Sequence, residues 1–146
     1  MGTFEGRLVL TCILTVLGAC GTAEDAREEL IVCGGYERAL GESLRQWMRT
    51  DQRGALAFIE AIGDSTDREL QDAEIPQAFG SASAIFGRSI FTPASENYRA
   101  AIEPPKFDRL TREGENLGQQ HFSERDSGAI GRFVANCTRS YVSLSR

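Results

Sequence analysis

Apolar residues recur at intervals of three and four along most of the chain, which is the period of amphipathic α-helices. The clearest stripes are Leu30, Cys33, Leu40, Leu44 and Trp47/Met48 near the start, and Ile130, Phe133, Val134, Cys137, Tyr141 and Leu144 at the end. A strand over residues 30–33 is the alternative for the first stripe, but no later segment offers it a convincing partner strand. We therefore predict an all-α, single-domain bundle of about five or six helices.

Two adjacent glycines, Gly34 and Gly35, interrupt the first stripe. Each costs about 1 kcal/mol relative to alanine inside a helix. We interpret this pair as a place where another backbone approaches closely, near Cys33. Gly114 and Gly118 occur in the stripe before the last helix, and we expect them to weaken that helix for the same reason.

The predicted helix boundaries between the first and last stripes rest on N-cap residues, capping boxes and prolines. These boundaries are Thr50 or Asp51 as the cap of a second helix, Gly63-Asp64 as its end, Thr66-x-x-Glu69 as the start of a third segment, Thr92-Pro93 as the start of another helix, Pro104-Pro105 as its end, and Ser123-x-x-Asp126 as the start of the last helix.

The most apolar stretch outside the first twenty residues covers residues 78–91. Its Phe-Gly pairs at 79–80 and 86–87 lie about two helical turns apart, so both rings face the same way. One interpretation is a central helix that its neighbours pack against closely. The other is an exposed apolar surface that binds a partner. The candidate residues of that surface are Phe79, Ile85, Phe86, Ile90 and Phe91.

The start of the chain has a different pattern from the helical stripes. Residues 8–19 are uncharged, and this run suits a signal-peptide core because a membrane span needs about 20 apolar residues. The run ends in Leu17-Gly18-Ala19-Cys20, which is an aliphatic residue, two small residues and a cysteine. This motif resembles the lipobox of bacterial lipoproteins, in which the cysteine receives the lipid.

The resemblance implies three parts: a signal peptide over 1–19, a tether over 20–29 that begins with lipidated Cys20, and a helical domain over 30–146. It implies a cell-envelope protein that faces the periplasm and contacts the membrane through its lipid anchor. Gly21 follows the cysteine in place of aspartate, and by resemblance to enterobacterial lipoproteins this favours the outer membrane over the inner one. Buried acyl chains supply about 0.8 kcal/mol of membrane affinity per CH₂ group.

Two other interpretations of this leader stay open. Gly21 and Ala23 place small residues where an ordinary signal peptidase needs them, so cleavage after Ala23 is one alternative. An uncleaved N-terminal anchor is the other. Only the lipoprotein interpretation retains Cys20 as a lipid-bearing residue.

The chain has four cysteines, of which two remain for pairing after export. Cys12 leaves with the leader, and Cys20 is either lipidated or removed. An even pair in an oxidising compartment predicts a disulfide between Cys33 and Cys137. Two buried free thiols are the alternative. The bond would join the first helix to the last, with Cα atoms roughly 4.4–6.8 Å apart.

The polar residues do not form a recognisable catalytic or cofactor motif. His121 is the only histidine, and its neighbours Ser123, Asp126 and Ser127 are too close along the chain to converge as a triad. We expect a capping or solvent-facing histidine there, no catalytic residue and no cofactor. A zinc site needs more Cys and His ligands than remain after export. A net charge of −5 without a basic cluster argues against nucleic-acid binding.

These features predict a membrane-anchored, non-catalytic envelope protein that binds an unidentified envelope protein, as an interaction, assembly or inhibitory module. The alternative is a carrier of a small apolar ligand, held in a pocket between helices with residues 79–91 as one wall. An enzyme of unknown class is a third hypothesis, and it would require a pKa-shifted carboxylate pair in a cleft.

Overall fold

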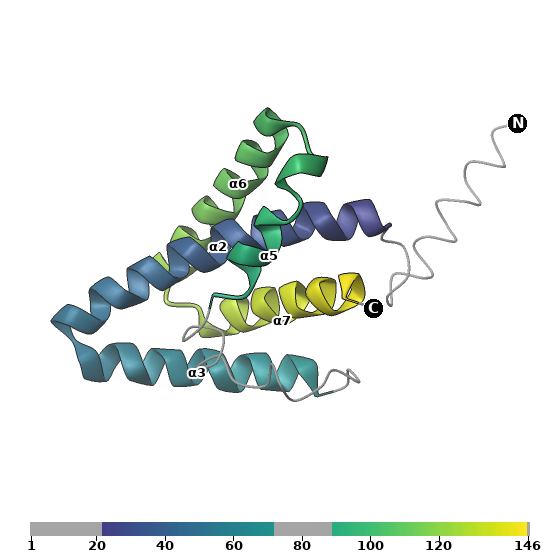
Figure 1. The fold of residues 1–146 in the computed structure, drawn as a ribbon. Helices are drawn as coiled ribbons and strands as arrows, with labels where there is room; N and C mark the ends of the chain where they lie inside the picture. The colour runs from purple at the N-terminus through teal and green to yellow at the C-terminus, as the bar shows by residue number, and fades with distance from the viewer. Residues whose placement is uncertain (1–21, 72–88, 146) are drawn as a thin grey trace, which may run out of the picture.

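The computed structural model describes residues 22–71 and 89–145. They form α2 (Ala23–Thr50), α3 (Gln52–Leu70), α5 (Phe91–Glu96), the short 3-10 helix η2 (Arg99–Ala101), α6 (Pro104–Ser123) and α7 (Ser127–Leu144) (Figure 1). No strand occurs in these two ranges. The prediction of an all-α helical bundle is confirmed. No helix within the ranges is long and apolar enough to cross a membrane.

The long helix α2 is the element against which the other four described α-helices pack. Figure 1 shows α6 on one side of α2, the α3–α7 pair on the other, and α5 crossing it. With 28 residues, α2 is about 42 Å long. The main core contains its buried residues Leu30, Leu40 and Leu44 together with Ile62 of α3 and Ile130 of α7.

The disulfide between Cys33 in α2 and Cys137 in α7 confirms the predicted pairing. Their Cα atoms lie 5.8 Å apart, although 104 residues separate them along the chain. Both side chains are buried in the main core cluster. The first and last helices of the described chain are therefore neighbours, as a bond at this spacing requires.

Gly34 and Gly35 lie where two other segments meet α2, so the predicted close approach near Cys33 is confirmed. A Cβ atom on Gly34 would lie 2.6 Å from the Oγ of Ser95 in α5. A Cβ atom on Gly35 would collide with the backbone carbonyl of Thr111 in α6. Glycine lowers the intrinsic stability of the helix. The close contact with two neighbouring segments is possible only because glycine has no side chain.

The glycines of α6 form the other half of this contact. A Cβ atom on Gly114 would collide with the carbonyl group of Val32, and one on Gly118 would lie 2.9 Å from the carbonyl oxygen of Tyr36. Besides their low helix propensity, these glycines have a packing role that the sequence did not indicate. They let α6 approach the backbone of α2, and packing of this kind contributes more stability than intrinsic helix propensity.

The predicted break in α3 does not exist. The helix continues through Gly63-Asp64 to Leu70, and Thr66 is buried inside it instead of capping a new segment. Its hydroxyl donates to the carbonyl oxygen of Ile62 at 2.8 Å, which satisfies the polar group locally. The predicted cap at Asp51 is confirmed, because its side chain accepts from the N–H of Gly54.

Three further boundaries differ from the predictions. Pro104 begins α6 instead of ending the preceding helix, which agrees with the preference of proline for the first helical turn. Ser123 ends α6, and Asp126 alone caps α7 by accepting from the N–H of Ala129. The short helix α5 begins at Phe91, one residue before the predicted cap.

Helix α2 begins within residues 20–29, the segment predicted as a tether. Thr22 and Asp25 form a capping box at the start of α2, so the segment Ala23–Glu29 is helical. Asp25 thereby satisfies the backbone N–H of Thr22, one of the donors left free at a helix start. Residues 20 and 21 lie outside the described ranges.

Candidate functional site

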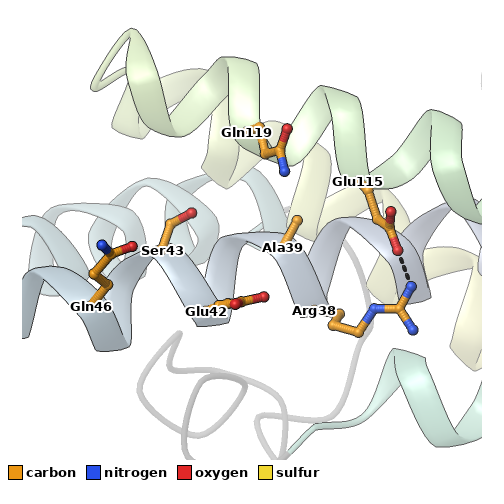
Figure 2. A pocket seen from close by; sticks show the side chains of 7 residues that line it. All are labelled: Arg38, Ala39, Glu42, Ser43, Gln46, Glu115 and Gln119. Carbon is orange, nitrogen blue, oxygen red and sulfur yellow. Dashed lines mark hydrogen bonds and ion pairs between the residues drawn. The ribbon is translucent and has the colours of Figure 1, made fainter.

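A polar groove lies between α2 and α6, close to their glycine-mediated crossing. It has a volume of about 290 Å³. Figure 2 shows the side chains that line it: Arg38, Ala39, Glu42, Ser43, Gln46, Glu115 and Gln119. On each helix they recur every three or four residues, with Arg38/Ala39 and Glu42/Ser43 as adjacent pairs, which places them on one face. We call this feature the α2–α6 groove.

An ion pair between Arg38 and Glu115 links the two helices at one end of the α2–α6 groove (Figure 2). The other polar side chains of the groove have no such partner. Among the described residues, Glu42, Ser43, Gln46 and Gln119 make no side-chain hydrogen bond with another residue. Figure 2 shows Gln119 pointing from α6 toward α2. Carboxylate, hydroxyl and amide groups are therefore available to a polar ligand.

A second hollow, of about 580 Å³, lies between the start of α2 and the end of α7. Its lining includes Asp25 and Glu29 from α2 and Arg139 and Ser140 from α7. The Ser140 hydroxyl donates to the Glu29 carboxylate at 2.9 Å, so part of this polarity is already satisfied within the protein. This hollow is therefore a weaker candidate than the α2–α6 groove.

His121 is neither solvent-facing nor a cap, contrary to the expectation. It is half-buried, and its Nδ1 lies 2.8 Å from the hydroxyl of Tyr36. The ring of Phe133 stacks on Tyr36 and meets His121 edge-on. Burial, with a smaller contribution from the charge of Asp126, raises the pKa of Tyr36. This arrangement packs the histidine against two aromatic rings, with the Tyr36 hydroxyl as its hydrogen-bond partner.

The proposed apolar binding surface needs a correction at Phe91. This side chain is only 2% exposed and packs in the main core, with its ring edge-on to Tyr141. Ile90 is half-buried against the same core. Phe79, Ile85 and Phe86 lie outside the described residues, as does Cys20. Phe91 is thus a structural residue, because α5 starts with it turned inward onto α2 and α7.

Sequence reasoning missed Tyr36 and Glu37, two buried polar residues next to the glycine pair. Tyr36 lies at helical spacing between Cys33 and Leu40, so the apolar stripe contained a signal for its burial. No such signal marks Glu37, which is 6% exposed and bonds to α5. A charged residue is expected at the surface unless a partner is known.

Comparison with known proteins found no matching family model, no similar curated protein and no similar solved structure. Within residues 22–71 and 89–145, no group of three or more His, Cys, Asp or Glu side chains is placed to hold a metal ion. The α2–α6 groove, with its unpaired polar groups, is therefore the basis on which we assign a function.

Proposed function

We propose that the protein is a lipid-anchored, non-catalytic protein of the bacterial cell envelope that binds another envelope protein through the α2–α6 groove. The observation that carries this proposal is the set of unpaired polar side chains, Glu42, Ser43, Gln46 and Gln119, in one groove. Donors and acceptors in this arrangement match the N–H and C=O groups of a polypeptide. They do not match a small apolar ligand, which requires a mainly apolar pocket.

The dimensions of the groove also suit a peptide segment. Its α2 lining runs from Arg38 to Gln46, a rise of about 12 Å along the helix. Three or four extended residues of a partner span that distance. The glycine contact holds α2 and α6 close together, so the two walls need little rearrangement on binding, and the entropic cost of association is reduced.

The lipobox supports the anchoring part of the proposal. If Cys20 carries the lipid, the anchor is attached two residues before Thr22, the cap of α2, in the sequence. The groove begins at Arg38, which lies about 24 Å further along α2. A domain attached in this way keeps the groove clear of the attachment point and available to a partner.

Site-specific photo-cross-linking in living cells tests the groove. A photoreactive amino acid is placed at Gln119, in the groove, and separately at Asn116, an exposed α6 residue outside the lining. We expect a discrete protein adduct from position 119 and a much weaker one from position 116. Equal adducts from both positions would contradict binding through the groove. Lipid adducts without a protein adduct would favour the carrier alternative.

Intact-mass analysis tests the anchor separately. We expect a diacylglyceryl-modified Cys20 at the N-terminus of the mature chain and loss of membrane partitioning in Cys20→Ala. A mature chain that begins at Glu24 would show ordinary signal-peptidase cleavage instead.

A further inference from the structure

Arg125 has a backbone conformation that glycine usually occupies. It follows α6 with φ = 52°, and it is the one non-glycine residue with positive φ in the described part of the chain. Its N–H donates to the carbonyl of Phe122 at 3.0 Å, and the N–H of Asp126 donates to that of His121 at 3.3 Å. These two bonds form a Schellman motif, in which glycine is the common residue at the position of Arg125. An arginine there is backbone-strained, so its side chain needs an explanation.

The guanidinium group of Arg125 is held over two aromatic rings. Its Cζ lies 3.9 Å from the ring centroid of Phe122 and 4.3 Å from that of Trp47. Phe58 of α3 packs against both rings, with centroid distances of 6.4 and 5.5 Å. The three rings are half-buried, whereas Arg125 is exposed. The planar cation is therefore held in one orientation before any ligand binds.

The positive charge of Arg125 has no carboxylate partner among the described residues. One guanidinium N–H donates to the carbonyl of Phe122. The carboxylates on either side of Arg125 in the chain have other partners: Glu124 accepts from the side chain of Gln120, and Asp126 caps α7. The remaining donors of the Arg125 guanidinium are available for a planar anion such as a carboxylate.

We propose that Arg125, together with Trp47 and Phe122, binds a carboxylate of an acidic polypeptide segment in the partner protein. This inference rests on the proposed function and adds an anchoring site to it. Trp47 lies one turn beyond Ser43 on α2, and Phe122 lies one turn beyond Gln119 on α6. The arginine site therefore lies about one helical turn beyond the α2–α6 groove on both helices, within reach of one extended partner segment.

Trp47 gives a direct readout, since it is the only tryptophan in the chain. The mature protein in detergent is titrated with a short peptide of alternating leucine and glutamate, and its fluorescence is recorded. The control peptide has glutamine in place of glutamate. We expect saturable change with the glutamate peptide alone. The same response to both peptides, or to neither, would overturn the proposal.

Substitutions at Arg125 test whether the anion binds there. We expect Arg125→Gln and Arg125→Gly to weaken glutamate-peptide binding about tenfold or more, the range for a charge-assisted bond. Arg112→Gln, which removes an exposed arginine of α6, should change binding less than about twofold. Arg125→Gly suits the backbone conformation, so it provides a folded variant if Arg125→Gln does not fold. Wild-type affinity in a folded Arg125 variant would overturn the assignment.

Two further arms separate the possible outcomes. Phosphatidylglycerol vesicles that change Trp47 fluorescence in the absence of any response to the glutamate peptide would reveal a phosphate site and overturn the proposal. Cross-links from position 119 that survive Arg125→Gln without any loss of yield would remove Arg125 from the interface while leaving the groove proposal intact. Peptide binding at Arg125 without cross-links at position 119 would contradict the groove proposal while supporting Arg125 as a carboxylate site.

Discussion

The carboxylate of Glu37 accepts hydrogen bonds from the backbone N–H and the hydroxyl of Thr92, at 3.0 and 2.8 Å, across 55 residues of sequence. Those two bonds are to the Oε1 atom of Glu37, and its Oε2 atom accepts from the backbone N–H groups of Ile90 and Phe91 at 2.9 and 3.1 Å. The N-cap residue of α5, Ile90, has no side-chain acceptor. Glu37 therefore supplies from α2 the cap that α5 lacks, and it fixes α5 across the central helix.

Glu37→Ala leaves three backbone donors without an acceptor at a mostly buried position. We expect the free energy of unfolding to fall by about 3 kcal/mol, and by less in Glu37→Gln, because the amide oxygen still accepts. Urea denaturation measures both. The control is Glu42→Ala on the exposed face of α2, with an expected change within about 0.5 kcal/mol. Similar losses at positions 37 and 42 would mean that the α5 contact contributes nothing.

Alanine substitutions test the glycine contact between α2 and α6. Gly114→Ala introduces a Cβ that collides with the carbonyl of Val32, so we expect a loss of about 1–3 kcal/mol despite better helix propensity. Gly41→Ala is the matched control, because its Cβ would meet only the end of the Arg45 side chain. That variant should be stabilised by up to about 1 kcal/mol. If Gly114→Ala were also stabilised, the close approach of the backbones would be refuted.

A pair of variants separates backbone strain from stacking at Arg125. Arg125→Ala removes the two ring contacts and retains the positive φ, with an expected loss of about 1–2 kcal/mol. Arg125→Gly removes the same contacts but relieves the backbone, so it should be about 1 kcal/mol more stable than the alanine variant. Thermal and urea unfolding measure the difference. Equal stabilities would show that the positive φ carries no cost.

Stability at high pH should depend on Tyr36. Burial raises its pKa, so the folded protein holds the phenolic proton to a higher pH than the unfolded chain does. This contribution is fully present below about pH 10 and is lost as the pH rises further. We expect the unfolding free energy to fall more steeply above pH 10 in the wild type than in Tyr36→Phe. Parallel curves between pH 8 and pH 11 would contradict this.

Reduction of the Cys33–Cys137 disulfide should be slow in the folded protein, because both residues are at most 1% exposed. Once the bond is reduced under unfolding conditions, stability should fall by up to about 4–5 kcal/mol, the loop-closure value for this separation. Non-reducing peptide mapping and alkylation with and without denaturant measure the two states. Rapid alkylation of both cysteines in native protein without reductant would disprove the pairing.

The amino-acid sequence alone determined the helical class, the last helix and the disulfide. Ile130, Val134 and Cys137 recur at the helical period, and α7 buries all three. The cap at Asp51 was equally predictable, because it depends on a backbone N–H three residues away. The helices and the cap depend on residues close together in the chain, whereas the disulfide was predictable because only two cysteines remain for pairing after export.

Tertiary structure decided the features that involve partners far apart in the chain. Gly63-Asp64 resembles a helix end, but α3 continues through it because it packs against α7. Ser65 of α3 lies in close contact with Gly131 of α7. Glu37 resembles a surface residue until α5 brings three N–H groups to it. The groove depends on how closely Gly114 lets α6 approach α2. A periodic pattern specifies which face of a helix is buried, but the depth and partner of each contact depend on distances that only the folded chain establishes.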